Sequence, residues 1–403
     1  MSSIIIRNIG PLKDTGKVEL DRFNVFVGEQ SSGKSTLVKL LCFCQWVEKQ
    51  VMTKGGNTLY DYTHYSRFLK ELKRFFRFDD TFFSGSSEIV YSGEGVRIEL
   101  SGTKNARIYH ANDFETNKHN VKLSFIPAER NLVSAIRNVD KNYKSNVNDV
   151  LFNHVFEWGE AKEAVSARGP VGLDMIGDME YYYDTARDAD VVRLRDAGIK
   201  TSPFYASSGV QSVLPVVVLV DYLTEHIFSD KVDLSRKDVS VLFRQLLESS
   251  GRNDDMMAVA DKVSRIVNYQ NTKIFIEEPE QSLFPTAQRD LLRYIVSRIN
   301  LASSKTGIPS SVTLTTHSPY VITAFNVLIK AAEAFSGHPE FARNVVADEM
   351  AVPISSVRAY YIGDGKLLDI VDREAGMIRG TELDAVSDEV EDDLNELNAV
   401  IYG

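Results

Sequence analysis

The segment Gly28-Glu29-Gln30-Ser31-Ser32-Gly33-Lys34-Ser35 is the feature that most constrains how this chain can fold. It fits the pattern G-x-x-x-x-G-K-[ST], it follows the apolar run Phe23 to Val27, and residues 35–50 carry apolar positions at helical spacing. Glycines at these places let successive backbone N–H groups turn inward around a phosphate, and the following helix adds its positive end. The segment therefore predicts a phosphate-binding turn between a strand and a helix.

Two side chains of this segment have expected roles of their own. Lys34 is expected to reach the β- and γ-phosphates of a nucleotide, and Ser35 is expected to give Mg²⁺ a hydroxyl ligand, because that ion prefers oxygen. The predicted nucleotide-binding residues are Gly28, Gln30, Ser31, Ser32, Gly33, Lys34, Ser35 and Thr36.

A second acidic element is expected on a neighbouring strand. The apolar run Lys273 to Ile276 ends in Glu277 and Glu278. Glu277 is placed to hold Mg²⁺, and Glu278 is placed to orient and deprotonate the attacking water; the alternative is a solvated acidic loop. A helical pattern over residues 286–299 and a strand pattern over Ser311 to Thr315 follow, and this βαβ order favours a parallel sheet.

Two further elements complete the predicted site. His317 follows the strand that ends at Thr316, and it is either a contact of the γ-phosphate or a core or capping histidine. Ser207, Ser208 and Gly209 open an apolar helix that includes Gln211, a pattern that by itself indicates only a helix cap. Beside the other elements, the same turn predicts a second anion site that closes on the nucleotide of a partner subunit.

These elements, in this order, resemble the head domain of ABC-type ATPases, and more closely the stand-alone branch of SMC-like and OLD (overcoming-lysogenization-defect) ATPases. Residues 28–35 resemble the Walker A motif, residues 207–209 the signature motif, Glu277 and Glu278 the Walker B motif with its catalytic glutamate, and His317 the switch histidine. The chain departs from transporters in having Glu at 277 and Ala-Ser-Ser-Gly-Val-Gln as its signature. The resemblance implies ATP and Mg²⁺ as cofactors.

The resemblance also implies a fold and a domain plan. The expected fold is an α/β ABC-type P-loop head with a mostly parallel core sheet, an added antiparallel β layer and a helical lobe with insertions. Residues 1–403 are expected to form one ATPase domain in three parts: 1–130 with Walker A and the antiparallel strands, 131–270 with the helical lobe and signature, and 271–403 with Walker B and the switch histidine. The expected insertions are 45–120, 131–200 and 225–270.

One family element is replaced in this chain. Where the family has a glutamine loop, the segment Phe125 to Arg130 ends a strand without a glutamine. Arg130 is either a contact of the phosphate or of the Mg²⁺ loop, or a member of a surface salt bridge.

The resemblance implies a head-to-tail dimer, or a higher even oligomer, in which ATP lies between Walker A of one subunit and the signature of the other. The tail from Glu382 to Glu396 is acidic, but Asp384, Asp388, Asp392 and Asp393 lack the strand context of a metal nuclease. A separate effector, such as a nuclease or toxin, is therefore the expected partner, as in anti-phage defence systems. The alternatives are a DNA-repair or chromosome-maintenance ATPase that clamps DNA, and an ATP-bound scaffold with negligible turnover, against which the paired glutamates argue.

Composition limits the remaining partners. Forty-six Lys and Arg against 56 Asp and Glu give a net charge of -10, so any DNA contact must be a local patch. The best candidate is the basic amphipathic segment Phe68 to Arg77, whose alternative is a docked helix with a wet face. Cys42 and Cys44 are too close for a disulfide framework, which favours a cytoplasmic chain. The apolar stretch Val213 to Tyr222 is too short to cross a membrane.

Overall fold

The computed structural model describes residues 2–54, 56–142, 149–228 and 264–380, together with Asn395 and Leu397. The predicted acidic tail with its aspartate cluster and most of the insertion at 225–270 lie outside the described residues. Within the described part, no helix is long and apolar enough to cross a membrane.

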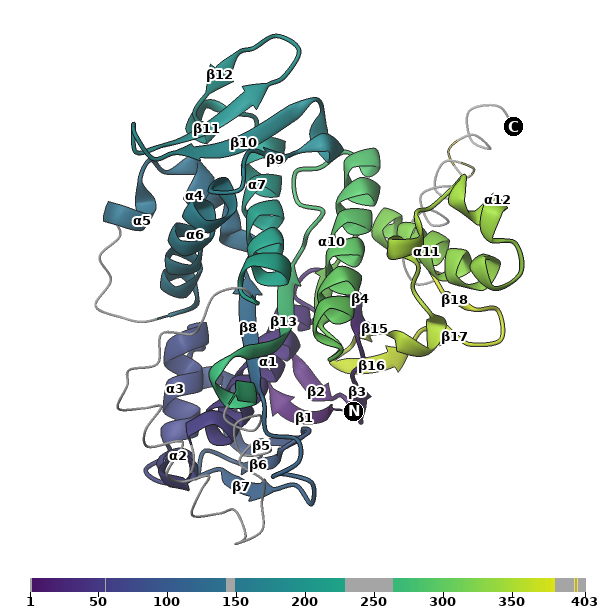
Figure 1. The fold of residues 1–403 in the computed structure, drawn as a ribbon. Coiled ribbons are helices and arrows are strands. Elements are labelled where there is room, and N and C mark those ends of the chain that lie inside the picture. Colours follow the sequence, from purple (N-terminus) through teal and green to yellow (C-terminus); the bar gives the residue numbers. More distant parts are fainter. Residues whose placement is uncertain are drawn as a thin grey trace, which may run out of the picture.

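Five parallel strands form one end of a twelve-stranded sheet (Figure 1). Their spatial order is β8 (Asn120–Ile126), β13 (Tyr269–Glu277), β14 (Ser311–Thr316), β4 (Phe23–Gly28) and β15 (Val357–Gly363). Because they run parallel, their carboxyl ends meet at one edge, which is where ligands bind in open α/β sheets. The predicted strands before Walker A, at Walker B and before His317 are confirmed.

Antiparallel strands extend the same sheet on one side. They are β1 (Ser3–Ile9), β2 (Leu12–Asp14), β3 (Val18–Glu19), β5 (Phe83–Ser92), β6 (Val96–Ser101) and β7 (Arg107–His110). Strand β16 (Lys366–Asp369) pairs with both β15 and β2, so it joins the two parts. The predicted antiparallel element is thus confirmed as a continuation of the core sheet, and the α/β class with its mostly parallel core is confirmed as well.

Helices cover both faces of the core sheet. Strand β4 shows why: Phe23, Val25 and Val27 belong to one hydrophobic cluster, whereas Phe26 belongs to the other, because side chains alternate along a strand. Helices α6 (Val150–Ser166), α7 (Ser208–Asp221), α10 (Pro285–Thr306) and α11 (Pro319–Gly337) supply the first cluster. Helices α1 (Lys34–Lys54) and α3 (Arg67–Phe76) supply the second. Every residue of β4 is therefore buried, as expected for a central parallel strand.

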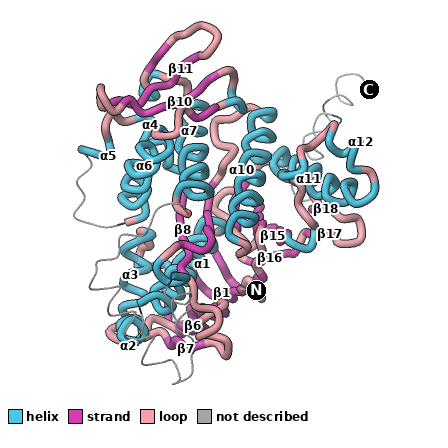
Figure 2. The backbone as a smooth tube through the Cα atoms, in the orientation of Figure 1, coloured by secondary structure: helices cyan, strands magenta, loops and turns pink. Residues whose placement is uncertain are grey.

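The helical lobe carries a small sheet of its own. Strands β9 (Val171–Gly172), β10 (Met179–Asp184), β11 (Ala189–Leu194) and β12 (Lys200–Thr201) form it, and each pair of neighbours is antiparallel. In Figure 2 this sheet lies at the top of the view, above α6, α7 and α10.

The first part of the helical lobe, over residues 131–166, is divided into separate helices. They are α4 (Leu132–Ala135), α5 (Val139–Asn142) and α6. Asn138 has a left-handed backbone (φ 50°), which a continuing right-handed helix excludes. Asp149 then caps α6, since its Oδ1 accepts from Phe152 N at 2.9 Å.

The basic helix α3 is docked as its pattern predicts. Phe68, Leu69, Leu72 and Phe76 are buried. Lys73 on its polar face pairs with an acidic neighbour rather than standing free. The segment is therefore a helix that packs on the rest of the protein. Its contact with DNA remains a prediction.

Candidate functional site

The loop between β4 and α1 has the backbone that a phosphate cradle requires. Gly28 and Gly33 have φ values of 151° and 109°, and Ser31 has 61°. A Cβ at Gly28 would lie 2.4 Å from the carbonyl oxygen of Ile362, and one at Gly33 would lie 2.7 Å from Leu12 Cδ2. Both positions therefore require glycine for conformation and for space, and α1 begins directly after them.

The other predicted residues of this loop divide by exposure. Gln30, Ser31 and Ser35 are exposed, whereas Lys34 and Thr36 are buried at 5% and 7% exposure. Ser32 is half-buried, and its Oγ has no hydrogen-bond partner among the described residues. The loop thus presents hydroxyl groups outward while the lysine stem packs inside.

The Lys34 ammonium lies inside the loop. Its Nζ donates to the carbonyl oxygens of Gly28 (2.8 Å) and Glu29 (2.6 Å) and lies 3.3 Å from His317 Nδ1. Burial lowers the pKa of Lys34 to about 8, although the neighbouring carboxylates, Glu278 first among them, act in the opposite direction. A negatively charged group bound beside Lys34 would therefore stabilise its ammonium form.

Glu277, at the end of β13, has an incompletely satisfied carboxylate. The residue is 2% exposed, its Oε2 accepts from Ala128 N at 3.4 Å, and its Oε1 has no partner within the described chain. A buried carboxylate oxygen without a partner fits a metal ligand. The described residues contain no group of three or more His, Cys, Asp and Glu side chains that would hold a metal alone. Ser35 and Glu277 therefore suit Mg²⁺, which usually combines one or two protein oxygens with phosphates and waters.

Glu278 leaves the strand through a strained turn. Its backbone is left-handed (φ 45°), and its N–H donates to the Thr315 carbonyl at 3.0 Å. The carboxylate Oε1 lies 3.1 Å from His317 Nε2, and this hydrogen bond is the first cause of a lowered Glu278 pKa. Glu278 is therefore ionised at neutral pH, which is the form that can accept a hydrogen bond or proton from water.

His317 connects the lysine to this glutamate. Lys34 Nζ can only donate, so His317 Nδ1 must accept, and the ring proton is assigned to Nε2, which donates to Glu278. The assigned state is a neutral imidazole between a cation and an anion. The structure thus brings together three of the predicted residues from three different strand ends.

Sequence analysis missed the function of Glu280. Its Oε1 accepts from Thr316 Oγ1 (2.7 Å) and from the His317 backbone N–H (2.8 Å), while burial raises its pKa. Glu280 thereby fixes the turn that presents the His317 ring. The available signal was its place in the run Glu277-Glu278-Pro279-Glu280, directly after the strand.

Arg130 contacts the backbone of the segment that carries Glu277, the predicted Mg²⁺ ligand. It is fully buried, which excludes a surface salt bridge. Its Nε donates to Ser212 O (3.1 Å), Nη1 to Glu277 O (2.8 Å), and Nη2 to Ser212 Oγ and Glu278 O (both 2.9 Å). Its donors bind the Walker B turn and α7, and a contact of Arg130 with phosphate stays a prediction. The surface alternative is wrong because an arginine buried beside strand-end carbonyls donates to them directly.

The serine turn caps α7 as predicted. Ser207 Oγ accepts from Val210 N at 3.5 Å, and both Ser207 and Ser208 are exposed. A Cβ at Gly209 would lie 3.3 Å from the carbonyl oxygen of Ser282, so α7 closely approaches the turn after Walker B. Gln211 instead folds back, and its Nε2 donates to the carbonyls of residues 203 and 204 at 3.1 Å. The contact of this turn with another subunit's nucleotide stays a prediction.

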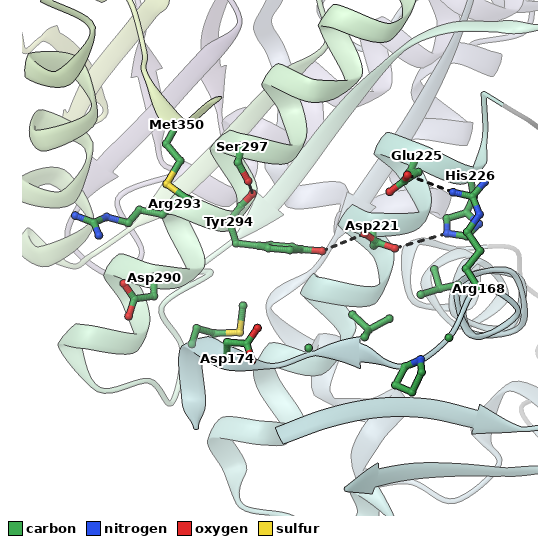
Figure 3. A pocket seen from close by; sticks show the side chains of 16 residues that line it. Arg168, Asp174, Asp221, Glu225, His226, Asp290, Arg293, Tyr294, Ser297 and Met350 are labelled. Carbon is green, nitrogen blue, oxygen red and sulfur yellow. Dashed lines mark hydrogen bonds and ion pairs between the residues drawn. The ribbon is translucent and has the colours of Figure 1, made fainter. Parts of the chain in front are cut away.

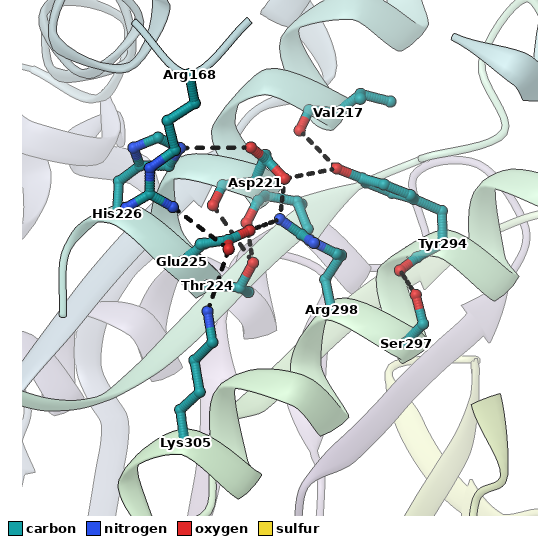
Figure 4. A network of polar contacts seen from close by, with 11 residues as sticks. Arg168, Val217, Asp221, Thr224, Glu225, His226, Tyr294, Ser297, Arg298 and Lys305 are labelled. Carbon is teal, nitrogen blue, oxygen red and sulfur yellow. Dashed lines mark hydrogen bonds and ion pairs between the residues drawn. The ribbon is translucent and has the colours of Figure 1, made fainter. Parts of the chain in front are cut away.

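The far ends of α7 and α10 are joined by an ionic cluster that sequence analysis did not identify (Figure 4). Arg298 on α10 pairs with Asp221, and with Glu225 at 2.6 Å. Arg168 and Lys305 also lie 3.3 Å from Glu225. The available signal was Asp221 and Glu225 at i, i+4 spacing after an apolar helix.

A cavity of about 610 Å³ adjoins this cluster (Figure 3). Its lining includes Tyr294, whose hydroxyl lies 3.4 Å from Asp221 Oδ1, and a π-helical turn over Tyr222–His226. Cations and carboxylates both line it and mostly pair with each other, so the cavity does not favour one ligand charge. It lies at the end of α7 opposite Ser207.

Comparisons with known proteins found similar solved structures only at low sequence identity. No protein-family model and no curated protein matches the chain. It is similar to the "SMC head domain from Thermotoga maritima", with 11% identity, a TM-score of 0.39, and coverage of 92% of this chain and 98% of that chain. It is also similar to a "nucleotide-free ATP-binding cassette from an ABC transporter", with 9% identity, a TM-score of 0.32, and coverage of 91% and 90%. Because these TM-scores lie below 0.5, the similarity carries no conclusion about activity or partners.

Proposed function

We propose that this chain is an ABC-type ATPase that binds Mg-ATP and hydrolyses it. The observation that carries the proposal is the chain Lys34, His317 and Glu278, which links the phosphate loop to an ionised carboxylate within hydrogen-bond distance at each step. The open Oε1 of Glu277 and the exposed Ser35 would hold Mg²⁺, whose charge would offset that of the phosphates. The role of Glu278 is to orient a water and to accept its proton.

We further propose that nucleotide is enclosed between two copies of the chain. Ser207 and Ser208 are exposed at the start of α7. They can therefore contact a nucleotide that is bound to a second copy of the chain. Phe284, directly after the Walker B turn, is 75% exposed, and Tyr320, three residues after His317, is 53% exposed. Exposed aromatic side chains at two neighbouring strand ends support a surface that a second subunit covers.

The biological role that we propose is a switch that controls a separate effector. ATP binding would close the pair and hydrolysis would loosen it, so that chemistry becomes a change of quaternary structure. The resemblance of the motifs to stand-alone SMC-like and OLD ATPases supports an effector such as a nuclease or toxin in anti-phage defence. Exposed Lys70 and Arg74 on α3 favour DNA as a second candidate partner.

The test combines turnover with solution mass. Lys34→Ala should abolish ATP binding, and Glu278→Gln should bind ATP without hydrolysing it. Glu278→Gln should shift to a dimer or larger even assembly when Mg-ATP is added, and Gly209→Glu in the same background should block that shift while it retains binding. Equal turnover in Glu278→Gln and wild type would remove Glu278 as the base. A mass that ATP does not change would favour the scaffold alternative.

A further inference from the structure

A second cavity, of about 260 Å³, lies away from the strand ends that carry the proposed ATP site. It is enclosed by α1, α3, α6, residues 122–125 of β8 and the first residue of β13. Much of its wall is aromatic, with Trp46 from α1, Phe75 from α3 and Tyr269 at the start of β13. This wall suits a flat apolar group, because aromatic rings stack on planar ligands.

Lys49 is the unexplained polar side chain of this cavity. Its Nζ lies 5.0 Å from the centre of the Tyr269 ring, and it has no hydrogen bond or ion pair within the described residues. Burial lowers its pKa to about 7, Lys122 and Lys54 act in the same direction, and Glu157 opposes them. A buried amine without an anionic partner is costly for the folded protein.

The nearest carboxylate is already engaged. Glu157 Oε1 pairs with Lys122 Nζ at 2.9 Å, and its Oε2 accepts from Ser124 Oγ at 2.6 Å. Both oxygens therefore serve other groups, and the charge of Glu157 is matched by that of Lys122. Lys49 is left as an additional positive charge in the cavity.

A second cation stands on the α3 side. Arg74 lines the cavity and is exposed, and it has no ion pair among the residues that the structure describes. The adjacent Glu71 does not neutralise it, because Glu71 binds Arg67 Nε at 2.7 Å and the Tyr62 hydroxyl at 3.2 Å. The lining thus has one half-buried and one exposed cation that lack anionic partners among the described residues.

We propose that this cavity is a binding site for a small planar organic anion, whose acidic group lies between Lys49 and Arg74 and whose flat part packs on the aromatic wall. The anion would supply the partner that Lys49 lacks, and charge-assisted hydrogen bonds are the strong kind. Its size suits a small metabolite, since the volume lies slightly below the usual range of pockets for drug-sized ligands. The site is separate from the proposed ATP site, but α1 forms part of both.

Pyridoxal 5′-phosphate is a suitable probe, because it is a planar anion whose aldehyde reports on a deprotonated amine. The amine attacks the aldehyde carbon, an imine forms as water leaves, and borohydride reduces the imine to a stable secondary amine. Wild-type protein is labelled at pH 7.5, and peptide mapping by mass spectrometry separates Lys49 from Lys34. Lys39, a half-buried lysine on the same helix that does not line the cavity, is the internal control.

The expected result is labelling at Lys49 that saturates with probe concentration and is at least about tenfold faster than at Lys39. Arg74→Gln should raise the half-saturating concentration about tenfold, the value of one charged hydrogen bond. Pyridoxal, which lacks the phosphate, should not saturate the site. Equal labelling of Lys49 and Lys39 would overturn the proposal. Labelling of Lys49 that is unchanged both by Arg74→Gln and by the use of pyridoxal would also overturn it, because Lys49 would then be only a reactive lysine.

Discussion

Replacing Arg130 with lysine tests how the site is held together. The guanidinium joins four backbone carbonyls and the Ser212 hydroxyl, from the Walker B turn and from α7. Lysine keeps the positive charge, but its single ammonium group cannot bind both segments in the geometry of a planar fork. The substitution therefore removes the bridge without removing the charge.

The magnitude follows from what is left unpaired. Each buried acceptor without a partner costs about 1–3 kcal/mol, and loss of one partner in a buried charged network costs about 3–5 kcal/mol in total. We expect Arg130→Lys to lower the free energy of unfolding by about 3–5 kcal/mol. Turnover should fall as well, because the backbone of Glu277 and Glu278 loses its anchor.

The assay is urea unfolding of the nucleotide-free protein at neutral pH. Arg137→Lys is the matched control, because Arg137 is an exposed arginine on the same segment that packs over Phe204 and Tyr205 at 4.9 and 4.8 Å. It should change stability by less than about 1 kcal/mol. A loss below about 1 kcal/mol for Arg130→Lys, together with a large drop in ATP affinity, would refute the structural role. Arg130 would then act on phosphate after all.

Three further predictions concern other parts of the molecule. Mg-ATP binding at pH 8.5 should take up most of one proton, because phosphate raises the Lys34 pKa from about 8 toward 10.5. Calorimetry in two buffers of different ionisation enthalpy measures this proton uptake, and Lys34→Arg should abolish the uptake. Glu280→Ala should lower unfolding free energy by about 1–3 kcal/mol and slow hydrolysis, whereas Glu280→Gln, which keeps an acceptor for the His317 turn, should do less. Arg298→Met should cost about 3–5 kcal/mol in urea because it removes the cation that Asp221 and Glu225 share in a partly buried network, whereas Arg293→Met on the same helix should cost under about 1 kcal/mol.

The local parts of the site could be predicted from the sequence. The turn at Gly28 and Gly33, the strand before Glu277 and the cap at Ser207 each depend on residues within a few positions. Short-range steric and hydrogen-bond rules therefore decide them. The same rules gave the βαβ order, and parallel strands then place their carboxyl ends at one edge.

Long-range polar contacts could not be predicted in this way. Arg130 was expected near phosphate or at the surface, but its partners lie 82 and more positions away, and burial makes them obligatory. The contacts of Glu280 and of the cluster around Arg298 could not be predicted for the same reason, because they also join residues far apart in the sequence. A sequence pattern does not say which buried donor meets which distant acceptor.

The sequence alone determined the phosphate loop, the acidic strand end, the histidine after the next strand and the alternation that buries β4 on both faces. These features follow from local backbone geometry and from the two-residue period of a strand. Only the tertiary structure decided that His317 lies between Lys34 and Glu278, that Arg130 binds backbone, and that Lys49 lacks an anionic partner. The reason is that partner choice in a buried polar network depends on distances across the whole fold, and pKa values depend on those distances.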